Sequence, residues 1–117
     1  AVFNVGRVSF LVAAFCSGRF EHLSAAMEDR LHQPYRAQLV PGLDEVCRAA
    51  RLAGASGVAL SGAGPTVIAL ACTATAPFER IGEAMTEAFL AAGVRSRYLV
   101  VSPSCTGAAV QVAGQLT

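Results

Sequence analysis

Apolar residues recur every three or four positions over three stretches in the first half of the chain, the period of an amphipathic helix. The first predicted helix is capped by Asn4 and ends at Gly18. The second starts at about Arg19, and the third covers residues 42–53 and ends at Gly54. The apolar positions are Val5, Val8, Leu11, Val12 and Phe15 in the first helix, Phe20, Leu23 and Met27 in the second, and Leu43, Val46, Cys47 and Ala50 in the third.

Two shorter apolar runs follow, at residues 58–60 and 67–70. They are too short for helices and carry β-branched residues, so we predict two strands buried on both faces or nearly so. A fourth helix opens with Pro77, ends at Gly93 and buries its apolar side. Residues 94–102 are predicted to form a strand, and residues 107–112 could add a last strand on an edge. The buried positions of the fourth helix are Phe78, Ile81, Met85, Ala88 and Phe89.

The order helix, hairpin, helix, strand is typical of an α+β fold with helices packed on one face of a mainly antiparallel sheet. Pattern by itself leaves several small α+β folds open. A chain of 117 residues supports a single domain, residues 1–117, with a core of its own. No apolar run is long enough to span a bilayer. The net charge of +1 predicts no attraction to nucleic acid or to a membrane surface.

The four cysteines, Cys16, Cys47, Cys72 and Cys105, are widely spaced. They form no C-x-x-C pair and have no histidine partner at ligand spacing. We therefore expect small buried thiols in a cytoplasmic protein, with no metal site and no disulfide.

The two predicted strands enclose the segment Ser61, Gly62, Ala63, Gly64, Pro65 and Thr66. Glycine permits positive φ and close approach of the backbone to another group, and Pro65 restricts Gly64 to conformations outside the α region. Consecutive exposed N–H groups in such a turn can bind an anion. An ordinary hairpin turn is the alternative. The segment has no lysine and no third glycine at the right offset, so it is neither a Walker A loop nor a dinucleotide fingerprint.

Residues 54–66 resemble the third motif of the GHMP kinase superfamily, which includes galactokinases, homoserine kinases and mevalonate kinases. Within it, the ending Pro65-Thr66 looks most like the homoserine kinases. Residues 29–41 are similar to the segment between the first helices of the C-terminal half of those enzymes. Residues 4–7, followed by an apolar helix, also fit. The resemblance covers most of the chain and weakens after about Ser102.

The resemblance implies a ferredoxin-like α/β sandwich, the C-terminal domain of an enzyme that transfers the γ-phosphoryl group of ATP to the hydroxyl of L-homoserine in threonine biosynthesis. It implies that loop 61–66 lies near the nucleotide phosphates and that Arg36 binds the carboxylate of homoserine. A surface arginine paired with Asp or Glu is the alternative for Arg36. ATP and Mg²⁺ would be held mainly by the missing N-terminal domain, so we expect this chain to be inactive when isolated. The resemblance leaves the catalytic base unassigned and makes a homodimer plausible.

Two other interpretations remain at this stage. One is a related GHMP kinase acting on mevalonate-type or sugar substrates, against which Pro65-Thr66 and residues 34–36 argue. The other is a non-catalytic regulatory module that binds an amino acid, which would not need loop 61–66. His32 is a possible general base, although a packing or exposed role is the simpler interpretation. Pro34 is expected to interrupt any helix in residues 32–36.

Overall fold

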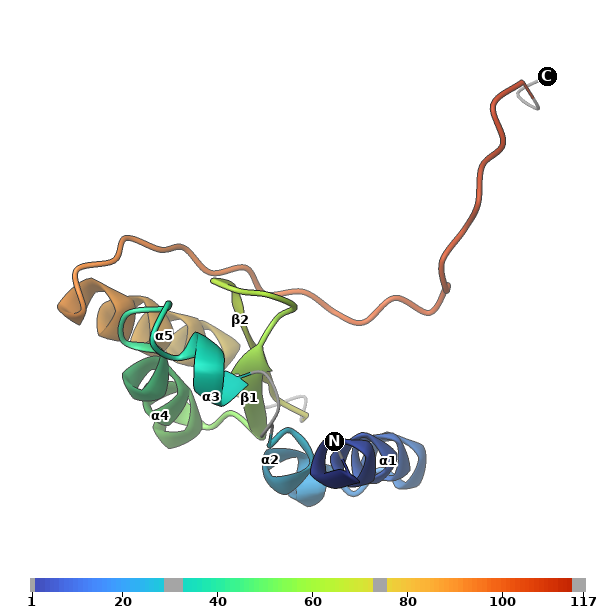
Figure 1. The fold of residues 1–117 in the computed structure, drawn as a ribbon, viewed down its shortest axis with the longest axis horizontal. Coiled ribbons are helices and arrows are strands. Elements are labelled where there is room, and N and C mark those ends of the chain that lie inside the picture. The colour runs from blue at the N-terminus through green and yellow to red at the C-terminus, as the bar shows by residue number, and fades with distance from the viewer. Residues whose placement is uncertain (1, 29–32, 73–75, 115–117) are drawn as a thin grey trace.

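The computed structural model describes residues 2–28, 33–72 and 76–114. Its elements, in chain order, are α1 (Val2–Ser17), the 3₁₀ helix η1 (Phe20–His22), α2 (Leu23–Ala26), α3 (Gln33–Arg36), α4 (Leu43–Ala53), β1 (Gly57–Leu60), β2 (Val67–Leu70) and α5 (Phe78–Ala91) (Figure 1). In the described ranges, no helix has the length and apolar character needed to cross a membrane. The predicted α+β class is confirmed.

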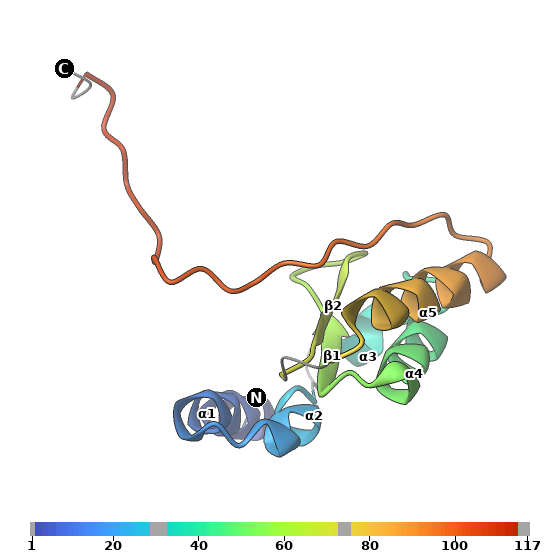
Figure 2. The same cartoon turned by 180° about the vertical axis from the view of Figure 1, so that it is seen from behind.

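The hairpin formed by β1 and β2 is antiparallel, with Val58 opposite Ala69 and Leu60 opposite Val67. Because side chains alternate along a strand, these four residues share one face, and all of them pack in or against the main core. Helices α4 and α5 complete that core. Figures 1 and 2 both show the two helices side by side, next to the hairpin.

Helices α4 and α5 run antiparallel and are joined at both ends. At one end, a Cβ on Gly42 would lie only 2.6 Å from Cβ of Ala92, so the chain before α4 requires a glycine where it passes the end of α5. At the other end, Nη2 of Arg80 donates a hydrogen bond of 3.3 Å to the carbonyl of Ala53, near the C-terminus of α4. The cation thereby satisfies a carbonyl in the last turn, where helices leave acceptors unpaired.

The predicted C-terminal ends of the longer helices are confirmed, whereas the predicted start of the first is wrong: α1 begins at Val2, so Asn4 lies inside the helix and does not cap it. Gly54, with φ of 117°, ends α4, and Gly18 and Gly93 follow α1 and α5 with φ of 70° and 82°. The inward positions predicted for α4 are buried, and Ile81 and Phe89 of α5 join them. The core comprises Val40, Leu43, Val46, Cys47, Ala50, Ala53, Val58, Ile81 and Phe89.

Helix α2 reaches the hairpin from the other face. A Cβ on Gly57 would overlap Sδ of Met27 and lie 3.2 Å from Cβ of Leu23, so only glycine allows β1 to approach α2 so closely. Leu23 is fully buried, as predicted. The second predicted helix is present as η1 followed by α2.

Helix α1 differs from the expectation for an amphipathic helix. Among its residues only Ala14 is buried, while Val5, Val8, Val12 and Phe15 are exposed. The spacing correctly predicted a helix, but it could not predict that this chain would leave the apolar stripe uncovered. Helix periodicity shows which residues share a face, but it does not show what packs against that face.

Two further predictions were wrong. Residues 94–102 and 107–112 form no strand, and they run as extended, mostly exposed chain. A strand requires a partner edge as well as an alternating sequence, and no described strand pairs with them.

Pro34 lies inside α3 instead of interrupting a helix. It occupies the first turn, where a missing N–H removes no intrahelical hydrogen bond.

Candidate functional site

Loop 61–66 joins the ends of β1 and β2 and is closed by its own backbone. The Ser61 amide donates to the Thr66 carbonyl at 2.8 Å, and the Gly64 amide donates to the Ser61 carbonyl at 3.1 Å. Gly62 and Gly64 have φ of 59° and 78°, and the Gly64–Pro65 peptide is cis. The expectation of left-handed glycines is confirmed, since both conformations are ones that side chains with a Cβ rarely adopt.

The outer surface of this loop is open. Ser61, Gly62, Ala63, Pro65 and Thr66 are all exposed. In the part of the chain that the structure describes, the amides of Gly62 and Ala63 and the hydroxyls of Ser61 and Thr66 take no part in a hydrogen bond. Nothing lies within 4 Å of the position that a Cβ on Gly62 would occupy. The loop therefore presents neighbouring donors to solvent, as an anion site requires.

The segment after α3 supports the inner side of the loop. A Cβ on Gly64 would lie 3.6 Å from Cγ2 of Val40, which is itself buried in the core. Val40 is one turn from Arg36: the amides of Leu39 and Val40 donate to the Arg36 carbonyl at 2.9 and 3.2 Å. A continuous hydrogen-bonded turn thus connects Arg36 to the base of loop 61–66. The sequence contained no signal for this contact, because the two segments are far apart in the chain.

Arg36 is the last residue of α3 and is partly buried. Its neighbour Tyr35 is 74% exposed, so the tyrosine ring does not form a packed support for the arginine. A guanidinium held at a helix end by a short turn can offer two parallel N–H donors to a carboxylate. Residues 29–32 of the motif, His32 among them, lie outside the described residues.

The side chain of Arg7, on the first helix, has partners within the chain. It lies 4.7 Å from the ring centroid of Phe3 and forms an ion pair of 3.7 Å with Glu28. The Arg7 side chain is 30% exposed. Arg7 therefore ties α1 to the end of α2, which is a structural role.

The cysteines differ from one another in exposure. Cys47 is buried, as predicted, whereas Cys16 and Cys105 are exposed, contrary to the expectation of buried thiols. Burial raises the pKa of the Cys47 thiol above its ordinary value of 9.0, and the positive charge of Arg51 opposes this shift in part. All four thiols are free.

Two other features lie away from the loop. An open hollow of about 410 Å³ is lined by Gly18, Phe20, Glu21, Ser56 and Cys72, none of which belongs to loop 61–66. Among the described residues, no group of three or more His, Cys, Asp or Glu side chains could hold a metal ion. No described residue is therefore assigned to a metal.

Comparison with known proteins identifies the family of this chain. The family model described as GHMP kinases C terminal matches residues 11–92. The chain belongs to the GHMP kinase family. The match includes α2 to α5, with loop 61–66 and Arg36 inside it.

The relatives indicate which kind of GHMP kinase this chain resembles. The chain is 54% identical to a homoserine kinase of Carboxydothermus hydrogenoformans over 92% of its own length and 34% of that protein. It is 47% identical to a homoserine kinase of Persephonella marina over 95% of this chain and 36% of that protein. Its fold superposes on the crystal structure of a homoserine kinase from Cytophaga hutchinsonii with a TM-score of 0.71 and 38% identity, covering 78% of this chain and 29% of that one. The chain thus spans about a third of the curated relatives it matches.

Proposed function

We propose that this chain is the C-terminal domain of a homoserine kinase, which transfers the γ-phosphoryl group of ATP to the hydroxyl of L-homoserine. The longer protein that would contain it is called the parent enzyme below. One observation supports the proposal most directly: an exposed, glycine-bent loop with unpaired donors is connected by a short turn to a partly buried arginine. The two groups supply complementary recognition, one for phosphate oxygens and one for a carboxylate.

In this proposal, loop 61–66 faces the phosphates of the nucleotide. Phosphoryl transfer requires mainly positioning and neutralisation of charge. The amides of Gly62 and Ala63 and the hydroxyls of Ser61 and Thr66, which have no hydrogen-bond partner among the described residues, would donate to phosphate oxygens. Because backbone donors are fixed by the turn, they need little rearrangement when charge builds up in the transition state.

Arg36 binds the carboxylate of homoserine. The guanidinium recognises a planar, negatively charged group with two parallel hydrogen bonds, which a lysine could not match. The proposal is supported by the turn from Arg36 to Val40, in which the Val40 amide donates to the Arg36 carbonyl and Val40 packs under Gly64 of the loop. Substrate acid and nucleotide phosphate would then be held by adjoining parts of the same domain.

Two components must come from the rest of the parent enzyme. The described residues contain no group of three or more His, Cys, Asp or Glu side chains for a metal ion, and none of them is assigned as a catalytic base. Mg²⁺ bound elsewhere in the parent enzyme would neutralise charge on the phosphates. We therefore expect the isolated 117-residue chain to have no kinase activity. A cytoplasmic location and a homodimer are part of the same proposal.

The test is a coupled assay of ADP release on the full-length protein, with L-homoserine, mevalonate and galactose offered in parallel. Phosphorylation of homoserine only, detected by mass as the phosphate ester, is the expected result. Turnover with mevalonate or galactose in place of homoserine would replace the proposed substrate by one of another GHMP kinase. Turnover of homoserine by the isolated chain would show that the remainder of the protein is not required.

A further inference from the structure

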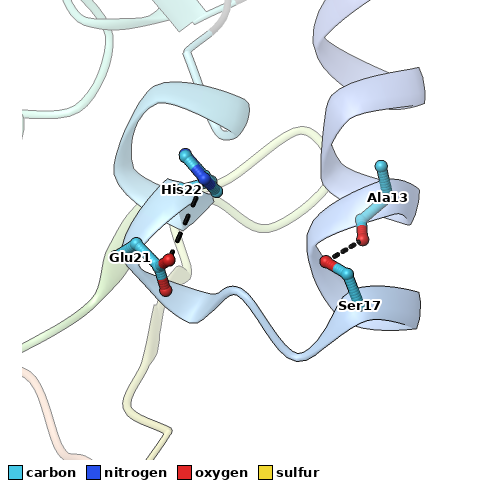
Figure 3. A network of polar contacts seen from close by, with 4 residues as sticks. All are labelled: Ala13, Ser17, Glu21 and His22. Atoms are coloured by element: carbon cyan, nitrogen blue, oxygen red, sulfur yellow. Dashed lines mark hydrogen bonds and ion pairs between the residues drawn. The ribbon is translucent and has the colours of Figure 1, made fainter.

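Helix α1 has two apolar faces, and its own chain covers only one of them. On the covered side the rings of Phe10 and His22 lie 5.1 Å apart, and Arg7 pairs with Glu28 at 3.7 Å. Ala14, on the same side, is 2% exposed. Figure 3 shows η1, with Glu21 and His22, beside the last turns of α1, where Ser17 Oγ donates to the Ala13 carbonyl at 2.7 Å.

The second face consists of Val5, Val8, Val12 and Phe15, and we call it the outer face of α1. Their exposed fractions are 67, 60, 55 and 50%. At about 100° per residue, these four positions fall within an arc of roughly 80°, on the side of the helix away from Phe10 and Ala14. They form one continuous apolar stripe along α1.

The composition of α1 indicates burial on both sides. Arg7 is the only charged residue among its 16 positions, and it belongs to the covered side. The outer face and its flanks therefore carry no charge. A helix that is apolar on opposite sides is stable in water only between two layers of protein, since each exposed valine or phenylalanine forgoes burial free energy.

The observations distinguish between possible occupants. A membrane is a poor match, because α1 has 16 residues where roughly 20 are needed to span and it lacks the basic face of an interfacial helix. A second copy of α1 is a poor match as well. The stripe covers only two heptads, whereas coiled-coil pairing uses about three or four with charged flanking positions.

The remaining part of the parent enzyme fits better. About two thirds of each relative lies outside the region that this chain matches. The family match is to the C-terminal part, and it begins at residue 11, within α1. Val5 and Val8 thus precede the matched region while Val12 and Phe15 lie inside it, so the outer face spans the start of the match.

We propose that the outer face of α1 is the surface on which the preceding part of the parent enzyme packs, through an uncharged apolar interface. This inference rests on the proposed function, because it takes the parent to be a two-part enzyme of which this is the C-terminal part. Helix α1 is then the layer shared by both parts.

The thiols of the chain provide the test. Cys16 is exposed, one turn after Val12, and Cys105 is exposed in the C-terminal segment, while Cys47 is buried. The 117 residues replace the matching third of the Carboxydothermus hydrogenoformans homoserine kinase, giving a full-length chimera. Both the chimera and the isolated chain receive timed pulses of N-ethylmaleimide, and each cysteine is quantified by peptide mass spectrometry.

We expect Cys16 to be labelled at least about tenfold more slowly in the chimera, with Cys105 labelled equally in both proteins. Cys47 should stay unlabelled in both, which reports that the core is folded. Equal labelling of Cys16 in the two folded proteins overturns the proposal. A chimera in which Cys47 becomes labelled also counts against it, because the two parts then fail to pack.

Two double variants test whether the outer face of α1 is responsible for the protection of Cys16. Val8→Asp with Val12→Asp should restore fast labelling of Cys16 in the chimera, whereas Val110→Asp with Val112→Asp, at exposed positions of the C-terminal segment, should not. If Cys16 labelling in the isolated chain slows with protein concentration and sedimentation shows a dimer, a second copy covers the face and the proposal fails. A chimera that protects Cys16 but does not phosphorylate homoserine removes the proposed function and leaves this inference standing.

Discussion

Val40 and Gly64 meet where the turn after α3 passes beneath loop 61–66. A Cβ on Gly64 would lie 3.6 Å from Cγ2 of Val40 and 3.0 Å from Cδ2 of Leu60, and Gly64 has φ of 78°. Glycine is therefore required at position 64 for two reasons: the backbone has a positive φ, and a Cβ would crowd Leu60 and Val40. Through this contact the base of the loop and the turn that begins at Arg36 form one packed unit.

Gly64→Ala should destabilise the isolated chain more than Gly62→Ala does. Both residues have positive φ, which costs a residue with a Cβ about 1–2 kcal/mol. Only Gly64 also has neighbours within 4 Å. Urea unfolding of the two variants measures the difference in the free energy of unfolding. An equal or smaller loss for Gly64→Ala would show that the packing beneath the loop is unimportant.

Arg36→Ala in the parent enzyme should raise the KM for homoserine and leave the KM for ATP nearly unchanged. Removing one partner of a desolvated charge pair costs roughly 2–5 kcal/mol, part of it from the unpaired substrate carboxylate. Steady-state kinetics with each substrate varied in turn measures both constants.

Arg48→Ala serves as the matched control for Arg36→Ala, since it removes the same side chain from an exposed position on α4. Its kinetic constants should equal those of the unmodified enzyme. A homoserine KM that does not change in Arg36→Ala would remove this arginine from the substrate site.

Gly82→Ala should displace the chain that follows α5. A Cβ on Gly82 would overlap the ring of Tyr98, which lies against this turn of the helix. Hydrogen exchange of residues 94–98 should therefore speed up in the variant. Gly6→Ala is the control, because Gly6 is also inside a helix but has nothing within 4 Å. That change should stabilise α1 by up to about 1 kcal/mol, and unchanged exchange in Gly82→Ala would contradict the Tyr98 contact.

Stability should fall at alkaline pH because of Cys47. The folded protein raises the pKa of this thiol, so its neutral form is favoured in the folded state and the unfolded state loses its proton first. The corresponding stabilisation is complete below the ordinary pKa and is lost as pH rises through the higher folded value. Urea titrations between pH 7 and about pH 10.5 should show this decline, and it should be smaller in Cys47→Ala. An identical slope in that variant would assign the decline to other groups.

The sequence predicted those elements whose limits and partners are local. Gly18, Gly54 and Gly93 marked helix ends, and the two β-branched runs marked the hairpin. The sequence-based prediction failed at residues 94–102. There the alternating side chains predicted a strand, but a strand also needs the edge of another strand to pair with, and that edge would come from a distant part of the chain. The prediction failed at Pro34 because a proline in a first turn and a proline in a link look alike in sequence.

The roles of loop 61–66 and Arg36 stay predictions, made from their motifs. The positive φ of Gly62 and Gly64 followed from residue type. The contact of Val40 with Gly64 could not be predicted, because it depends on how α3 and the hairpin pack in three dimensions. The exposure of Cys16 was missed for the same reason as that of the α1 stripe.

The antiparallel pair of α4 and α5 is held at both ends, by the approach of Gly42 to Ala92 and by the hydrogen bond from Arg80 to Ala53. A helix pair held at both ends should unfold cooperatively instead of fraying from one end. Partial denaturation should therefore leave it as the last structured remnant of the polypeptide, and a circular permutant with new termini at another surface turn should retain it intact.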